Sequence, residues 1–66
     1  MRALSRQQRR VLERLWAGDT VKTAAAHLGI SPKTATTYLT RLRRVNGVPT
    51  TIALIRTAVR TGALQP

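Results

Sequence analysis

The sequence predicts an all-α domain of four helices, the second and third of which form a helix-turn-helix. Apolar residues recur at helical spacing in four successive segments, and no segment alternates as a β-strand does. Each segment follows a serine or threonine that can cap a helix, and a glycine stands shortly after each one. Because 66 residues cannot form two hydrophobic cores, we expect the whole chain, residues 1–66, to be a single domain.

The first helix is predicted over residues 6–17. Ser5 can cap it, and Gln8 stands where its side chain can reach back to complete a capping box. Gly18 ends the helix. One face is apolar and consists of Val11, Leu12, Leu15 and Trp16. We therefore expect Trp16 to be a core residue and not a platform on which bases stack.

The second helix is predicted over residues 21–28, with Thr20 as its cap. Its apolar stripe consists of Val21, Ala24, Ala25 and Leu28. Gly29 stands where a left-handed residue commonly ends a helix, so we expect a positive φ there. His27 has no second ligand at helical spacing, and we expect it on the surface.

The third helix is predicted over residues 32–44, after Ser31 as cap and Pro32 at the first helical position. Its apolar stripe consists of Ala35, Tyr38, Leu39 and Leu42. A tight glycine turn between two short helices is typical of a helix-turn-helix, and small alanine side chains allow the helices to cross closely.

A fourth helix is predicted over residues 51–61, beginning near Thr50 or Thr51 and ending at Gly62. Its apolar stripe consists of Ile52, Ile55 and Val59. A four-helix domain need not bury this stripe completely, so we expect it to be the contact surface of a dimer. The last few residues have no pattern and are expected to be loose.

Charge indicates the class of partner. Twelve Lys and Arg against two acids give a net charge of +10, which indicates a polyanion: DNA, RNA or an anionic membrane surface. Glycine turns divide the apolar stripes among four helices, which disfavours the membrane. No apolar run has the length of a membrane span, and residues 1–6 do not begin a signal peptide.

The composition disfavours an enzyme or a metalloprotein. The chain has no cysteine, one histidine and two acidic residues. A disulfide framework and a Cys-based zinc or redox site are therefore impossible. The sequence also contains no nucleophile–base pair and no phosphate-binding loop. We expect no catalytic residue, no metal and no cofactor.

The polar face of the third helix carries the prediction of DNA binding. It consists of Lys33, Thr36, Thr37, Thr40 and Arg44, which lie on one stripe opposite the apolar one. Threonine lowers helix propensity, so helix stability does not explain three threonines there. A threonine hydroxyl can bond a base or a phosphate, and its methyl can contact that of thymine. We expect Lys33 and the threonines to contact bases.

Phosphate contacts are expected from groups on either side of the groove. Ser31 and Thr34 lie at the start of the third helix, where free N–H groups and the positive end of the helix dipole attract an anion. Tyr38 lies on the apolar stripe, but its hydroxyl can emerge to meet a phosphate. The remaining candidates are basic side chains: Lys22, Arg41, Arg43 and Arg44.

The sequence resembles the LuxR-type, or GerE-like, DNA-binding domain from about Leu4 to Leu64. The matching residues are Leu4-Ser5, Val11-Leu12, Gly18, Lys22, Ala25, Leu28 to Ser31, Thr34, Leu39, Leu42, Gly47-Val48 and Gly62. Region 4 of bacterial sigma factors is a near relative. The resemblance implies transcription regulation by major-groove binding, often as a dimer through the last helix. It also implies that Thr36, Thr37 and Thr40 approach bases.

The sequence departs from the family pattern at several positions. The family usually has glutamate at Gln8 and at Thr23. It favours Val at Ala35, Lys at Thr36, His at Tyr38 and Arg at Thr51. Its DNA-binding domain usually follows a sensor or receiver domain, whereas the resemblance here begins near the first residue, so we expect a free-standing domain.

Two hypotheses of function remain. The first is a bacterial, cytoplasmic transcription regulator that binds specific sites in double-stranded DNA. Such a regulator can bind these sites as a homodimer. The second is a small interaction module that docks on RNA polymerase or another regulator through Ile52, Ile55 and Val59. The high positive charge favours the first hypothesis.

Overall fold

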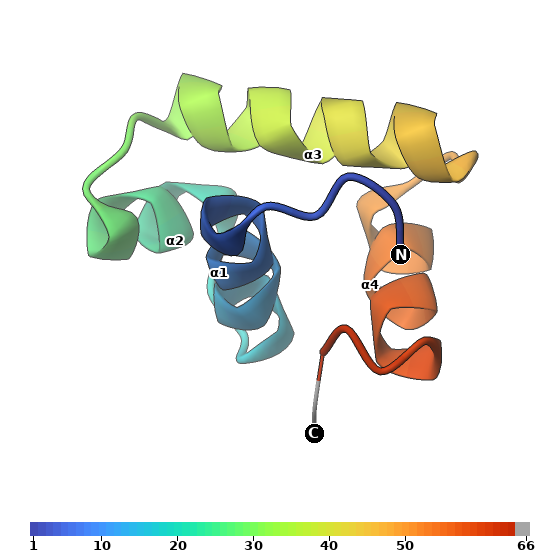
Figure 1. Ribbon diagram of the computed structural model, residues 1–66. Helices are drawn as coiled ribbons and strands as arrows, with labels where there is room; N and C mark the ends of the chain where they lie inside the picture. Colours follow the sequence, from blue (N-terminus) through green and yellow to red (C-terminus); the bar gives the residue numbers. More distant parts are fainter. Residues whose placement is uncertain (65–66) are drawn as a thin grey trace.

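The computed structural model describes residues 1–64. Over this range the chain forms four α-helices and no strand: α1 (Arg6–Trp16), α2 (Val21–Leu28), α3 (Pro32–Asn46) and α4 (Thr51–Arg60). Figure 1 shows α3 lying along one side of the molecule, with the other three helices beneath it. The predicted all-α, four-helix fold is confirmed. The third helix continues to Asn46, beyond its predicted end.

Side-chain caps explain where the helices begin. Ser5 Oγ accepts from the Gln8 N–H at 3.1 Å, and Gln8 Oε1 accepts from the Ser5 N–H at 3.0 Å. This is the capping box that the sequence predicts. Ser31 caps α3 in the predicted way, with Pro32 in the first turn. Each of these helices therefore starts where its own sequence directs.

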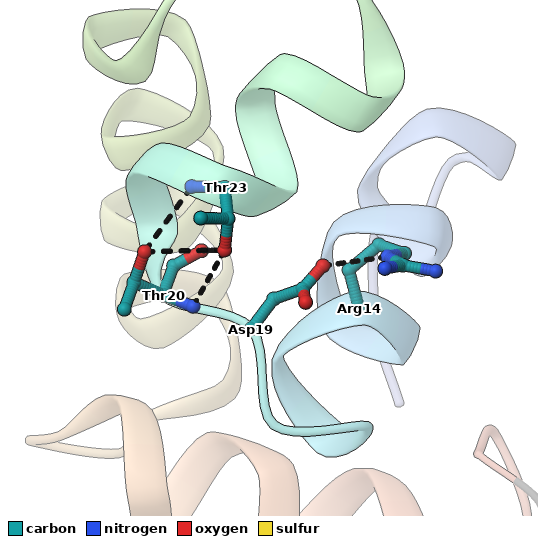
Figure 2. A network of polar contacts seen from close by, with 4 residues as sticks. All are labelled: Arg14, Asp19, Thr20 and Thr23. Carbon is teal, nitrogen blue, oxygen red and sulfur yellow. Dashed lines mark hydrogen bonds and ion pairs between the residues drawn. The ribbon is translucent and has the colours of Figure 1, made fainter.

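The turn between α1 and α2 is held by an ion pair and by reciprocal hydrogen bonds between Thr20 and Thr23 (Figure 2). The Asp19 carboxylate lies 2.6 Å from Nε of Arg14. At the start of α2, Thr20 Oγ1 accepts from the Thr23 N–H, and Thr23 Oγ1 accepts from the Thr20 N–H at 2.9 Å. Thr23, where the resemblance leads us to expect glutamate, thus still completes a capping box. The ion pair, being partly exposed, contributes no more than about 1 kcal/mol.

The hydrophobic core lies among α1, α3 and α4. Its buried residues are Val11, Leu12, Leu39, Leu42, Leu54, Ala58 and Leu64. α2 packs against both α1 and α3, and Ala24, Ala25 and Ala35 are completely buried, which agrees with the close packing expected of small side chains. Gly29, with φ of 68°, ends α2 in the left-handed conformation that the sequence predicts.

The end of α3 is tied to the N-terminal segment. Asn46 Oδ1 accepts from the Arg2 N–H at 2.9 Å, and Asn46 Nδ2 donates to the Arg2 carbonyl at 3.1 Å. The same amide nitrogen lies 2.8 Å from the carbonyl oxygen of Leu42 in the preceding turn of the helix. Asn46, the last residue of α3, therefore fixes the position of the first residues of the chain, and Gly47 ends the helix in the left-handed conformation.

Two predictions about the core are wrong. Trp16 is 47% exposed, because the last turn of α1 lies beside the outer face of α4 and an open groove separates them. Leu64, expected to be loose, is buried, because its N–H donates to the Ala58 carbonyl and the chain folds back onto the core. Gln65 and Pro66, the remainder of that tail, lie outside the described residues.

Candidate nucleic-acid interface

The side of α3 opposite the core is a continuous polar surface. A shallow depression along this helix is lined by Lys33, Thr36, Thr37, Thr40, Arg41 and Arg44. All of these side chains are exposed except that of Thr40, which is half-buried. The structure thus brings together the four residues predicted to contact bases and two of those predicted to contact phosphates. We call this surface the α3 face.

The hydroxyl groups on the α3 face differ in the bonds that they already make. Thr37 Oγ1 donates to the Lys33 carbonyl at 3.0 Å, so its lone pairs and its methyl group remain for a ligand. Thr36 is exposed, and its hydroxyl has no partner within residues 1–64. Adjacent threonines on one helix therefore present different hydrogen-bonding groups to a ligand.

Arg43 is held differently from the other arginines of α3. Its guanidinium donates from Nη1 to Thr51 Oγ1 at 2.9 Å and from Nη2 to Thr40 Oγ1 at 3.3 Å. A guanidinium has no acceptor, so Thr40 accepts this bond and keeps its own O–H for another partner. The side chain of Arg43 is half-buried. Its bond to Thr51 joins α3 to the first turn of α4, and this link was not predicted from the sequence.

The start of α3 lies at one end of the α3 face. Ser31 Oγ accepts from the Thr34 N–H at 3.0 Å and lies 2.9 Å from Thr34 Oγ1, so the two hydroxyls interact with each other. The first turn of α3 contains no acidic residue, and the positive end of its dipole is not compensated. Ser31 is exposed and Thr34 is half-buried. A phosphate would meet N–H groups here.

Lys22 and Tyr38, the other predicted phosphate contacts, lie outside this depression. Lys22 is exposed in the first turn of α2. Tyr38 is half-buried and packs against the core, and its hydroxyl has no hydrogen bond within the described part of the chain. The ring of Tyr38 therefore packs against the core, while its hydroxyl makes no hydrogen bond to the described residues.

The basic side chains of the α3 face have no acidic partner. The chain has two acidic residues; Asp19 pairs with Arg14, and Glu13 is exposed on α1. Within residues 1–64 no Lys or Arg of α3 forms an ion pair. The positive charge of this surface is therefore available to an anionic ligand.

Metal and membrane sites find no support in the described residues. No group of three or more His, Cys, Asp or Glu side chains lies close enough to hold a metal ion. None of the helices in residues 1–64 combines the length and the apolar composition that crossing a membrane requires.

An apolar groove lies between the last turn of α1 and α4. It is lined by Leu15, Trp16, Ile52, Ile55, Arg56, Val59 and Arg60. Of the residues predicted as a dimer contact, Ile52 is 71% exposed, whereas Ile55 and Val59 are half-buried against the core. Trp16 and the two arginines were not predicted to belong to this surface. The spacing of Arg56 and Arg60, one helical turn apart beside the predicted stripe, was the signal that could have identified them.

Comparison with known proteins agrees with the four-helix fold. The GerE family model, described as "Bacterial regulatory proteins, luxR family", matches residues 2–58 of the chain. The match includes α1, α2 and α3 completely and most of α4. A search of curated proteins gave no match, and neither did a search of solved structures.

Proposed function

Because the chain belongs to the luxR family of bacterial regulatory proteins, a family of DNA-binding helix-turn-helix domains, we propose that it regulates transcription by reading specific sites in double-stranded DNA. The observation that carries the proposal is the α3 face, where three threonines lie among basic side chains that have no acidic partner. Such a regulator acts at the nucleoid, in the bacterial cytoplasm.

In this proposal α3 enters the major groove with its polar face toward the bases. Lys33, Thr36, Thr37 and Thr40 contact base edges, where short side chains allow the helix to approach closely. The groups around them bind phosphates and fix the orientation of the helix: Lys22, Ser31, Thr34, Tyr38, Arg41, Arg43 and Arg44. Because Arg43 is held by Thr40 and Thr51, it contributes by supporting α3 as well as by its charge.

We further propose that two copies pair on DNA through α4. A single recognition helix reads only a few base pairs, which is too little to locate one site in a genome. A two-fold arrangement doubles the sequence that is read and requires a repeated half-site. The exposure of Ile52 and the partial exposure of Ile55 and Val59 support this choice of contact. Phosphates would screen the repulsion between two subunits that each carry +10.

Selection of bound duplexes from a random pool tests the proposal directly. We expect a palindromic consensus, and we expect the affinity for it to fall steeply with salt. For roughly four to six phosphate contacts per subunit, affinity should drop on the order of a hundredfold or more between about 50 and 200 mM salt. A flat salt dependence would exclude nucleic acid as the main partner. Recovery of no consensus at all would exclude sequence-specific reading.

A further inference from the structure

The apolar groove between α1 and α4 exposes large apolar side chains to solvent. Trp16 is the single tryptophan of the chain, and nearly half of it is in contact with solvent at the end of α1. Opposite it, Ile52 is the most exposed large apolar residue of the domain. Leu15, Ile55 and Val59 form the floor between them. Clustered apolar side chains of this kind commonly mark a docking surface.

The rim of the groove is strongly basic. Arg56 and Arg60 line it, are exposed, and lie one helical turn apart on α4. Both acidic residues of the chain are on α1 or at its end, and neither forms an ion pair with these arginines. The groove therefore offers an apolar floor flanked by two positive charges, to which an occupant with an apolar stripe and acidic flanks is complementary.

A second copy of this chain is a poor occupant in the absence of DNA. Two-fold pairing across the groove brings Arg56 and Arg60 of one subunit toward the same residues of the other, and each subunit carries a net charge of +10. Like charges placed together at an interface disfavour the complex. The free protein is therefore left with an open groove that its own surface does not complement.

We propose that this groove binds an acidic amphipathic helix of another protein. The length of α4, ten residues or about 15 Å, matches about three turns of such a helix. Apolar residues of the partner at positions i, i+3 or i+4 and i+7 would contact Trp16 and Ile52. Glutamates or aspartates on the flank of the partner helix would pair with Arg56 and Arg60.

The binding of such a helix excludes pairing through α4, since both use Ile52, Ile55 and Val59. An acidic partner would thus act as a regulator of the DNA-bound pair. It would leave the α3 face free to bind DNA, and it would remove only the affinity that pairing with the second subunit adds. This consequence rests on the proposed function, whereas binding of the helix to the groove does not.

A designed peptide of three to four helical turns tests the proposal, with leucine on one face, glutamate on the other and no tryptophan. Because Trp16 is the sole tryptophan and lines the groove, its emission reports occupancy. We expect a saturable shift of the emission to shorter wavelength. The change Arg56→Glu with Arg60→Glu should weaken binding at least tenfold, and Ile52→Ala several-fold. All three residues are exposed, so the fold should persist.

The control variant is Arg10→Glu, a charge reversal at an exposed residue of α1 outside the groove. It should change peptide affinity less than twofold. For a comparison at equal change of charge, Arg56→Glu is also made alone. Equal loss of peptide affinity for Arg10→Glu and for this single Arg56→Glu variant, or equal binding of a scrambled peptide of the same composition, would show mere attraction between opposite charges and overturn the proposal. A free protein that sediments as a dimer dependent on Ile52 would also overturn it, because the occupant would then be a second copy.

The DNA experiment separates this proposal from the proposed function. On a palindromic duplex the peptide should displace one subunit and leave one bound. If the protein fails to bind any DNA but the peptide still shifts the Trp16 emission, the groove is a docking site and the proposed function is wrong. If DNA binding is specific and the Trp16 emission never changes, the docking proposal is wrong.

Discussion

Among single residues, Thr37 and Thr40 show how intramolecular hydrogen bonds decide what a side chain can offer to DNA. The Thr37 hydroxyl gives its proton to the Lys33 carbonyl and can only accept a further bond. The Thr40 oxygen accepts from Arg43 and can still donate. Thr37 is therefore suited to an amino group or a thymine methyl, and Thr40 to an acceptor such as guanine O6 or N7.

Replacing either threonine should reduce discrimination between cognate and random DNA. We expect Thr37→Ala or Thr40→Ala to cost on the order of 1–3 kcal/mol of specificity if a good base contact is lost. Competition binding with cognate and mismatched duplexes measures this difference. The control, Arg41→Ala, should weaken all sequences alike, because a phosphate contact carries no sequence information. Unchanged discrimination in both threonine variants would refute their assignment to base contacts.

Arg43→Ala should lower the stability of the domain. Its side chain makes two hydrogen bonds, one to Thr40 within α3 and one to Thr51 of α4, and each contributes roughly 0.5–1.5 kcal/mol, so we expect a loss of about 1–3 kcal/mol. Urea denaturation measures the effect. Arg44→Ala, an exposed neighbour with no such bonds, is the matched control and should change stability by less than about 0.5 kcal/mol. Equal stability of the two variants would contradict a supporting role for Arg43.

Residue positions that depend on a distant helix could not be predicted from the sequence. The sequence placed Arg43 with Arg41 and Arg44 because all three are basic residues of one helix. Its different role depends on Thr51, which only the packing of α4 against α3 brings within reach. Trp16 was misplaced for the same reason. Its burial depends on how closely α4 approaches the end of α1, and spacing within one helix does not contain that information.

At the scale of helices and turns, local sequence signals were sufficient to predict where the helices begin. Ser5, Thr20 and Ser31 cap the helices that follow them, as predicted, because an N-cap bonds to a backbone N–H only three residues away. The burial of Ala24, Ala25 and Ala35 was predictable because only small side chains permit close contact between helices. In α4, by contrast, the sequence prediction assigned Ile52, Ile55 and Val59 to a stripe that need not be buried completely, and it did not name Leu54 and Ala58, which are the buried residues of this helix. Two apolar faces were available there, and only packing selects one.

The turn within the helix-turn-helix gives a prediction at this scale. Gly29 has φ of 68°, and a Cβ added there would meet nothing within 4 Å. Gly29→Ala should therefore destabilise the domain by backbone strain alone, about 1–2 kcal/mol. Gly29→Asn should cost less, because asparagine tolerates the left-handed conformation. Thermal or urea unfolding of the two variants measures the difference. An alanine variant as stable as the wild type would contradict the left-handed turn.

The assembly of the whole molecule depends on its charge and on the apolar groove together. We expect free protein to be monomeric and two subunits to bind a palindromic duplex, because phosphates screen a repulsion that otherwise opposes pairing. Sedimentation of free protein and of the complex measures the stoichiometry. Ile52→Ala should reduce cooperativity on the duplex without changing the affinity for a single half-site. One subunit per duplex at saturating protein would refute the paired complex.

The two hydrogen bonds between Asn46 and Arg2 have a consequence for folding kinetics. They join residues 44 apart in sequence, whereas most helical contacts are local. Closing so long a loop costs entropy that the helices must first offset, so this contact should form after the rate-limiting step. Asn46→Ala should therefore accelerate unfolding and leave the refolding rate nearly unchanged. Stopped-flow measurements over a range of urea concentrations would resolve the two rates. If refolding slowed in proportion to the lost stability, the chain would instead begin to fold by bringing its first residues to the end of α3.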